Sequence, residues 1–261
     1  MQKTLLNTIP NDLPLEIEKF IGKSKIYDSS GHSGATVYFI DKANGYYLKS
    51  APKGTLVRES EMTAYFHAKG LGAEVLSYIS GEKDFLLTEK VRGEDCTHST
   101  YVESPKRLSI LQGEELRKLH ELDYKGCPAL NKTEEYFAIA ERNFHLDNYD
   151  KSHFPDNFGY RSAEEAYAVL QEGKGSLKSD VLVHGDYCLP NVILDDWKLS
   201  GYIDVGGGGV SDRHIDLFWG LWSLGFNLKT DKYSELFLDA YGRDKVDKEI
   251  LKIVAAAEVF G

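Results

Sequence analysis

The stretch that decides the fold is VLVHGDYCLPNVILDDWKLSGYIDVGGGG, residues 181–209, which places polar side chains around two short apolar runs. Asp186 and Asn191 lie five residues apart, and Asp204 follows the second apolar run. Each of the three stands beside a β-rich run, on a predicted turn rather than within a helix. Turn formation alone would explain any one of them, because Asp and Asn are common turn residues. The presence of all three at this spacing, with the dipeptide His184-Gly185 directly before Asp186, indicates a chemical role.

Carboxylate and amide oxygens are hard ligands of the kind that Mg²⁺ prefers, usually together with phosphates and water. A carboxylate near such a metal can orient a substrate hydroxyl and accept its proton during phosphoryl transfer. The order Asp-x₄-Asn, hairpin, Asp-x-Gly resembles the catalytic and metal-binding loops of kinases, with HGD replacing HRD and IDVG replacing DFG. The pattern therefore predicts a phosphoryl-transfer site.

The first third of the chain predicts a small sheet with one helix. ATVYFID (35–41) and GYYLKS (45–50) read as two strands, and Asn44-Gly45 between them is a strong hairpin signal. A helix is predicted over 59–69, followed by strands over 74–80 and 85–91. Lys49 ends the second hairpin strand and Glu59 opens the helix, where a kinase places its phosphate-anchoring Lys–Glu ion pair. An ordinary surface pair is the alternative, and the downstream pattern favours function.

Two further segments of this region are candidates for nucleotide contacts. The loop SSGHSGA (29–35) would cover the phosphates with Ser33 and backbone N–H groups, although it lacks a G-x-G-x-x-G pattern and could be a plain loop. The strand that enters a linker near residues 91–95 offers backbone N–H and C=O groups at Glu89 and Val91 to an adenine edge. A simple connection between lobes is the alternative there.

Beyond that linker the pattern becomes mainly helical. Helices are predicted over 104–123, over 162–173 and over 247–261. Ser162 and Glu165 form a capping box at the start of the second of these. The sequence thus predicts an α+β chain with a small β-rich lobe and a larger helical lobe.

Composition limits the partners. A net charge of −10 disfavours nucleic acid and suits a cationic ligand. No apolar run is long enough to span a bilayer, and the first twenty residues lack the apolar core of a signal peptide. The three cysteines are widely spaced and odd in number, which fits reduced thiols. We expect a cytoplasmic protein, a monomer or weak dimer, with no nucleic-acid or membrane partner.

The stretch from His184 to Asp216 closely resembles the aminoglycoside 3′-phosphotransferases, the kanamycin and neomycin kinases. HGDYCLPN, SGYIDVG, GVSDR and RKLHELDYKGCPAL have close counterparts there, as does the ending AAEVFG. The resemblance implies a two-lobe protein-kinase-like fold, with a nucleotide-binding lobe over 1–92 and a catalytic and acceptor-binding lobe over 93–261. It also implies ATP or GTP with Mg²⁺, and transfer of the γ-phosphate to a hydroxyl of a cationic antibiotic.

Carried over residue by residue, the resemblance gives each polar side chain a role. Asp186 would be the catalytic aspartate, and Asn191 and Asp204 would be the metal ligands. Lys49 and Glu59 would be the phosphate-anchoring pair. His184 we interpret instead as a structural residue of the loop, because an imidazole in such a turn can hydrogen-bond the backbone.

The acceptor side of the resemblance is less complete. Glu258 and the end of the chain near Phe260 would reach the aminoglycoside, and Asp156 is the one acidic candidate in the loop before the capping box. The family usually has an Arg directly after I-D-x-G, where this chain has Gly207. It usually has Arg and acidic residues in the helix that follows, where residues 217–227 read LFWGLWSLGFN without charge.

These departures leave alternatives open. The acceptor could be a macrolide, choline or a sugar rather than an aminoglycoside. A nucleotide-binding module without turnover is the alternative from another class. The presence of Lys49, Asp186, Asn191 and Asp204 together argues against that module.

Overall fold

The computed structural model describes residues 3–30 and 34–261, and the chain divides into two compact units. The first unit is Met1–Glu94 with Ile193–Gly206, and the second is Asp95–Val192 with Gly207–Gly261. The first unit therefore takes back a short segment from the middle of the second unit's sequence. The division of labour between nucleotide and acceptor over these units stays a prediction.

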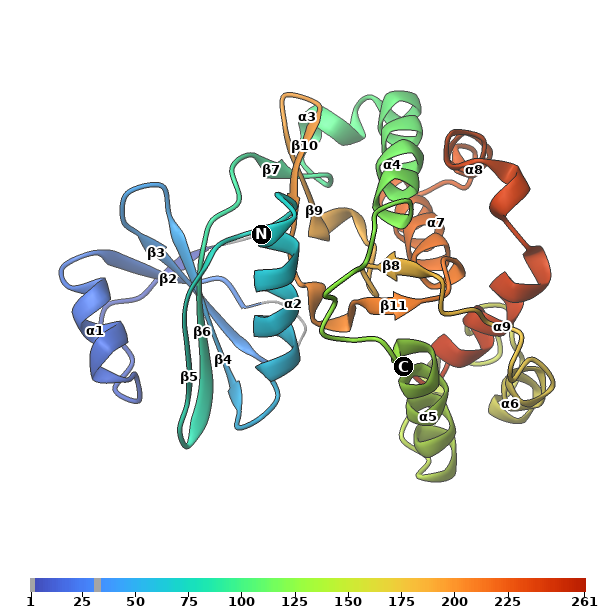
Figure 1. Cartoon of the computed structure of the whole chain (residues 1–261), viewed down its shortest axis with the longest axis horizontal. Helices are drawn as coiled ribbons and strands as arrows, with labels where there is room; N and C mark the ends of the chain where they lie inside the picture. The colour runs from blue at the N-terminus through green and yellow to red at the C-terminus, as the bar shows by residue number, and fades with distance from the viewer. Residues whose placement is uncertain (1–2, 31–33) are drawn as a thin grey trace. The chain divides into compact units, whose positions relative to one another are not determined.

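The first unit is built on a six-stranded sheet in the order β1-β2-β3-β4-β6-β5 (Figure 1). Its strands are β1 (Thr4–Leu5), β2 (Lys25–Asp28), β3 (Thr36–Asp41), β4 (Tyr46–Pro52), β5 (Val75–Ser80) and β6 (Lys83–Glu89). The predicted hairpin is confirmed, since β3 and β4 pair antiparallel and Gly45 supplies a φ of 96° in their turn. Strands β1 and β2 extend the sheet beyond the predicted part.

The two faces of this sheet have different neighbours. On one face the short helix α1 (Leu15–Ile21) packs Ile17 and Ile21 against Leu48 and its neighbours. Because successive residues of a strand point to opposite faces, Lys49 projects from the other face. The helix α2 (Val57–Ala68) lies on that side and brings Glu59 to Lys49. Figure 1 shows α1 and α2 on different sides of the sheet.

A second, three-stranded sheet has the order β10-β9-β7. Its strands are β7 (Glu94–Asp95), β9 (Val192–Asp195) and β10 (Lys198–Tyr202). Asp196 and Trp197 turn the β9–β10 hairpin with φ values of 48° and 62°, as a two-residue hairpin turn requires. The N–H of Tyr202 donates to the carbonyl of Leu71 at 2.7 Å, which attaches the end of β10 to the first unit.

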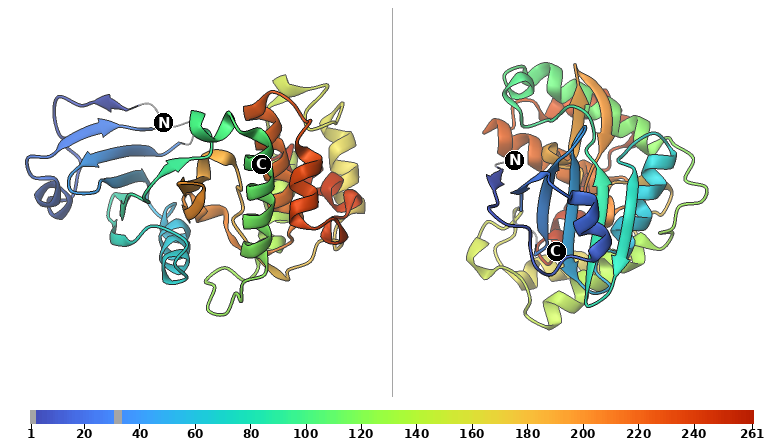
Figure 2. Two further views of the ribbon diagram at one scale, coloured as in Figure 1. Left: turned by 90° about the horizontal axis from the view of Figure 1, so that it is seen from above. Right: turned by 90° about the vertical axis from the view of Figure 1, so that its left-hand side faces the viewer.

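The second unit is mainly helical, with one buried strand pair (Figures 1 and 2). Its helices are α3 (Ser99–Val102), α4 (Pro105–His120), α5 (Lys132–His145), α6 (Ala163–Glu172), α7 (His214–Leu228), α8 (Ser234–Tyr241) and α9 (Lys248–Glu258). The strands are β8 (Val181–Val183) and β11 (Gly209–Ser211), which pair antiparallel. One-turn 3₁₀ helices occupy Lys151–His153, Leu189–Asn191, Val205–Gly207 and Arg243–Lys245. The predicted helices correspond to α4, α6 and α9.

The capping box at the start of α6 is present in a modified form. Ser162 Oγ accepts the N–H of Glu165 at 3.3 Å, as predicted. The Glu165 carboxylate accepts the N–H of Arg161 at 2.9 Å, one residue before the expected partner. Both backbone donors are satisfied, so the helix begins at the predicted place.

Candidate active site

Lys49 lies at the centre of an ion-pair cluster in the first unit. Its Nζ atom is 2.8 Å and 2.9 Å from the two carboxylate oxygens of Glu59, and it also contacts the carboxylate of Asp204. The predicted Lys49–Glu59 pair therefore exists. The structure adds Asp204 as its third member, which the segment 193–206 carries into this unit.

Opposing effects act on the charges of this cluster. Burial alone would lower the pKa of Lys49, but the carboxylates of Asp204 and Glu59 outweigh it and raise that pKa above its ordinary value. Burial raises the pKa of Glu59, which the Lys49 ammonium opposes. Lys49 is thus held as a cation at neutral pH.

Asp204 stands in an unusual backbone conformation two residues after the end of β10. Its φ of 60° is left-handed, a region that Asp tolerates better than most residues. The side chain is 44% exposed, so carboxylate oxygen remains accessible next to Lys49. A Cβ atom at Gly206 would lie 3.1 Å from the Glu59 side chain, which explains the Asp-x-Gly pattern as a close approach of loop and helix.

The face of the sheet that carries Lys49 also carries a second candidate for nucleotide contact, which the sequence analysis did not identify. Tyr47 stands two residues before Lys49, on the same face, and pairs in register with Thr88 of β6. Its ring lies 5.3 Å from that of Phe39, centroid to centroid. A flat base bound near the end of β6 with its phosphates at Lys49 would therefore lie over Tyr47. The signal was available, because residues i and i−2 of a strand share a face.

The segment after β6 shows which backbone groups are free to meet a ligand. The N–H of Glu89 donates to the carbonyl of Glu74, and that of Lys90 donates to Gly45, both at 3.0 Å. The Glu89 N–H is therefore not available to an adenine. Of the two groups predicted at Glu89, only the C=O could still meet one. Within the described residues, the Val91 N–H makes no backbone hydrogen bond.

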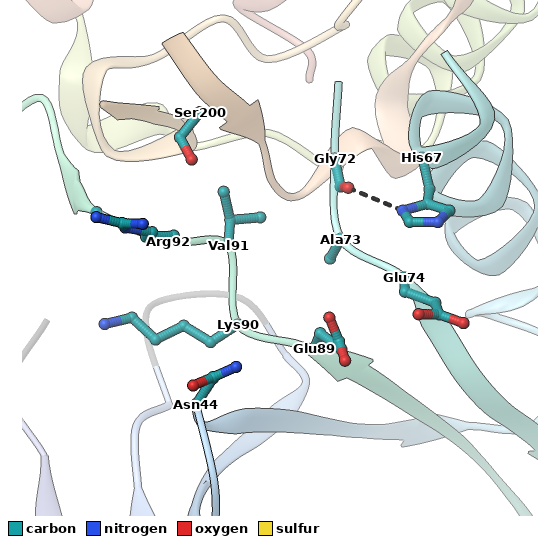
Figure 3. Close-up of a pocket in the computed structure, with 11 residues that line it drawn as sticks. Asn44, His67, Gly72, Ala73, Glu74, Glu89, Lys90, Val91, Arg92 and Ser200 are labelled. Atoms are coloured by element: carbon teal, nitrogen blue, oxygen red, sulfur yellow. Dashed lines mark hydrogen bonds between the residues drawn. The ribbon is translucent and has the colours of Figure 1, made fainter. Parts of the chain in front are cut away.

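A cavity of about 610 Å³ adjoins this segment, with Glu89 and Val91 in its lining (Figure 3). Figure 3 shows the Val91 side chain directed toward Ser200, and His67 bonded to the Gly72 carbonyl. Neither Tyr47 nor Lys49 is among its described lining residues. We therefore do not assign this cavity to the nucleotide. Ser33, the predicted phosphate-loop residue, lies outside the described residues.

In the second unit, Asp186 and Asn191 lie in direct contact. Asn191 Nδ2 donates to the Asp186 carboxylate at 2.9 Å and to the Asp186 carbonyl at 3.0 Å. A 3₁₀ turn over Leu189–Asn191, with a proline in its first turn, brings Asn191 back to Asp186. Both bonds use the amide nitrogen, so the amide oxygen takes no part in this contact.

Asp216, in the first turn of α7, holds the backbone of this loop. Its two carboxylate oxygens accept the N–H groups of His184 at 2.7 Å and Gly185 at 2.8 Å, and His120 Nε2 donates to it at 3.1 Å. His184 is fully buried, and its Nδ1 accepts the N–H of Asp186 at 3.3 Å. The structural interpretation of His184 is confirmed.

Gly185 is required by both its conformation and its surroundings. Its φ is 86°, and a Cβ atom there would lie 2.1 Å from the carbonyl oxygen of Gly207. The glycines at 206–209 form part of a 3₁₀ turn and the start of β11. Gly207 thus packs against the loop that carries Asp186.

Glu258, at the end of α9, is a carboxylate with an altered proton affinity. It accepts the hydroxyl of Tyr136 at 2.8 Å and the indole N–H of Trp219 at 3.0 Å. Burial raises its pKa to about 7, against the two hydrogen bonds and with the nearby charge of Asp186 adding to the shift. An ammonium group bound here would lower that pKa and hold the carboxylate charged.

The two other predicted acceptor residues are placed less favourably. The Phe260 side chain is fully buried in the core, where its carbonyl accepts Asn143 Nδ2 at 2.7 Å. It supports the end of α9 and presents no surface to a ligand. Asp156 is exposed on the loop before α6.

No metal site made only of protein side chains is present in the described part of the chain. Residues 3–30 and 34–261 contain no group of three His, Cys, Asp or Glu side chains placed to hold a metal ion. A different kind of site, in which Mg²⁺ takes one or two protein oxygens and completes its shell with phosphates and water, stays a prediction for Asn191 and Asp204. Across the same residues, no helix has the length and apolar character needed to span a membrane.

Comparisons with known proteins show the family of the chain. The phosphotransferase enzyme family matches residues 27–251. A probable aminoglycoside 3′-phosphotransferase of Lactococcus lactis is 48% identical over 96% of this chain and 98% of that protein.

Two solved structures share the fold. The crystal structure of an aminoglycoside 3′-phosphotransferase of type VIII superposes with a TM-score of 0.80 at 26% identity, covering 94% of this chain and 97% of that one. An aminoglycoside phosphotransferase from Streptomyces rimosus, in complex with ADP and streptomycin, reaches a TM-score of 0.72 at 22% identity over 88% and 94% of the two chains. The chain belongs to the phosphotransferase enzyme family, with aminoglycoside phosphotransferases as its relatives.

Proposed function

We propose that this protein transfers the γ-phosphate of ATP to a hydroxyl group of an aminoglycoside antibiotic. The observation that carries the proposal is the Asp186–Asn191 contact on a loop that the buried carboxylate of Asp216 holds in place. The match of nearly the whole chain to an aminoglycoside 3′-phosphotransferase supports the same substrate class.

The first unit's residues fit the nucleotide. Lys49 would bind phosphate oxygens, oriented by Glu59, while the base lies over Tyr47 and meets the Val91 N–H. Asn191 and Asp204 would hold Mg²⁺, which neutralises charge on the phosphates when it is bound. GTP could replace ATP, because backbone contacts of this kind do not by themselves select one purine.

The second unit's residues fit the acceptor. Asp186 would accept the proton of the acceptor hydroxyl as its oxygen attacks the γ-phosphate and ADP leaves. Glu258 would bind an ammonium group of the same molecule. The net charge of −10 favours a cationic acceptor, and the free thiols of Cys96, Cys127 and Cys188 fit the proposed cytoplasmic location. We propose a monomer or weak dimer.

The direct test is coupled ADP release with Mg-ATP in the presence of kanamycin, neomycin, a macrolide, choline or no acceptor. Turnover with kanamycin or neomycin alone supports the proposal. Turnover with a macrolide or choline, and none with aminoglycosides, would support the proposed phosphoryl transfer but contradict the proposed acceptor class. Nucleotide-dependent thermal stabilisation without ADP release would identify a binding module instead.

Replacing Lys49 with methionine is expected to lower kcat/KM for ATP by roughly a hundredfold, because the phosphates lose a positioned cation. The same change leaves the Glu59 and Asp204 carboxylates without their shared partner. Initial rates at varied ATP give the effect. Lys53→Met, at an exposed lysine just beyond β4, is the matched control and should match the wild type. Equal loss in both variants would point to altered folding.

The pKa of Glu258 predicts a pH dependence for acceptor binding. With a pKa of about 7 in the free protein, the carboxylate is mostly protonated at pH 6 and mostly charged at pH 8. The KM for a cationic acceptor should therefore fall as pH rises, by up to about tenfold between these values. The experiment compares wild type with Glu258→Gln, in which this part of the pH dependence disappears. A profile that is the same in both proteins would assign it to the acceptor's own amines.

A further inference from the structure

The helix α7 carries a row of aromatic side chains that reaches solvent. Trp219, Trp222 and Phe226 are three and four residues apart, so they lie on one side of the helix. Trp222 is 40% exposed and Phe226 is 56% exposed. Their rings are stacked, with centroids 5.0 Å apart and planes within 12° of each other. Exposed aromatic surface of this extent calls for a partner.

Phe158 forms a wall at the side of this row. Its ring meets Trp219 edge to face at 6.2 Å and Trp222 at 6.5 Å, centroid to centroid. The φ of Phe158 is 49°, a left-handed value that is costly for an aromatic residue. The surrounding contacts therefore hold the ring in place. We call Phe158, Trp219, Trp222 and Phe226 the aromatic shelf.

The aromatic shelf is continuous with the residues proposed to bind the acceptor. The indole N–H of Trp219 donates to Glu258 at 3.0 Å. One turn further along α7, Ser223 Oγ accepts the N–H of Leu189 at 2.9 Å, which ties the helix to the loop that carries Asp186. A molecule with one group at Asp186 and another at Glu258 therefore has the shelf as its next surface.

The exposed rings are not needed to bury α7 against the core. Its opposite side already does this, with Leu217 and Leu224 almost fully buried. At the far end of the shelf, Lys229 Nζ lies 4.1 Å from the centroid of Phe226. The shelf is thus an apolar strip with a carboxylate at one end and an ammonium at the other.

We propose that the aromatic shelf binds the C–H face of one sugar ring of the acceptor while an ammonium group of that molecule faces Glu258. This inference rests on the proposed function, and it identifies the surface that selects the acceptor. Aromatic faces attract both apolar C–H groups and ammonium groups. Residues 217–227 of α7 carry no charge, so the ring face rather than the charge count of the acceptor decides recognition here. Acceptors with an apolar face on the ring beyond the phosphorylated one are favoured.

Binding of the acceptor to an aromatic surface predicts that its KM depends only weakly on salt. Ion pairs at an exposed site weaken as salt screens them, whereas contacts with an aromatic face change little. The acceptor KM of the wild type should rise less than threefold between 50 mM and 500 mM NaCl. In Phe226→Glu, which adds a carboxylate to the shelf, the same acceptor should bind with a clearly stronger salt dependence.

The test measures acceptor and nucleotide KM in Trp222→Ala and Phe226→Ala, with the aminoglycoside that the wild type turns over best. Each variant should raise the acceptor KM about tenfold and leave kcat and the KM for ATP within twofold of wild type. Trp222→Phe, which keeps a ring, should restore most of the affinity. Leu146→Ala, at a 68% exposed leucine after α5, is the control for loss of exposed apolar surface.

The outcomes separate the two proposals. An active wild type whose alanine variants keep the acceptor KM overturns the shelf and leaves the proposed function in place. A wild type that releases no ADP with any aminoglycoside overturns both. Equal loss of kcat and of thermal stability in the alanine variants, without rescue by Trp222→Phe, would assign the rings to folding and also overturn the shelf.

Discussion

Asp186→Ala is expected to lower kcat by about a thousandfold or more while ATP still binds. The variant removes the carboxylate proposed to accept the proton of the acceptor hydroxyl, a contribution that reaches 10²–10⁴ in general-base catalysis. It also removes the oxygen that Asn191 Nδ2 contacts at 2.9 Å, although the bond to the Asp186 carbonyl remains. Lys49, Glu59 and Asp204 are untouched, so the nucleotide keeps its anchors.

The measurement pairs coupled ADP release with calorimetric titration of a non-hydrolysable ATP analogue. Asp239→Ala, at an exposed aspartate of α8, serves as the control and should match the wild type in both assays. If Asp186→Ala retained activity within tenfold of wild type, the assigned mechanism would be wrong. Loss of nucleotide binding together with activity would instead show that the variant has not folded.

Gly185→Ala is expected to abolish turnover and to lower stability by roughly 2 kcal/mol or more. The new Cβ would meet the Gly207 carbonyl at 2.1 Å, and the φ of 86° is unfavourable for alanine. Relief requires the loop to move, which breaks the bonds from His184 and Gly185 to Asp216. Buried donors left without partners then add to the loss.

Gly207→Ala is the matched control, because it changes the other side of the same contact. A Cβ there would lie 3.4 Å from the nearest atom of Gly185, an ordinary van der Waals distance. It should keep near wild-type kcat and melt within a few degrees of wild type. Thermal melts and initial rates are measured for both variants. A Gly185→Ala variant with wild-type activity and melting temperature would contradict the role given to this contact.

Local patterns in the sequence predicted much of the fold. The β3–β4 hairpin follows from two β-rich runs around Asn44-Gly45, and α6 begins where Ser162 indicates a cap. In these elements neighbouring residues decide the outcome. The short strands β1 and β2 escaped prediction, because two and four residues carry too little periodicity to detect.

The candidate site depends more on contacts between distant residues. Lys49 and Glu59 were placed together by analogy of position, yet Asp204 joins them across 155 residues of sequence. Glu258 was named from the resemblance, but its partners Tyr136 and Trp219 come from other helices and follow only from packing. Asp216 accepts the N–H groups of His184 and Gly185, and these contacts follow from the packing of α7 against the HGD loop.

The return of Ile193–Gly206 to the first unit has a consequence for the order of folding during synthesis. A ribosome that has released Glu94 has supplied the six-stranded sheet but not the hairpin that ends in Asp204. At synthesis rates of about 5–20 residues per second, the missing segment follows several seconds later. The Lys49 ammonium and the Glu59 carboxylate must wait that long for their third partner. A truncated nascent chain should therefore be protease-sensitive around α2 until residue 206 has emerged.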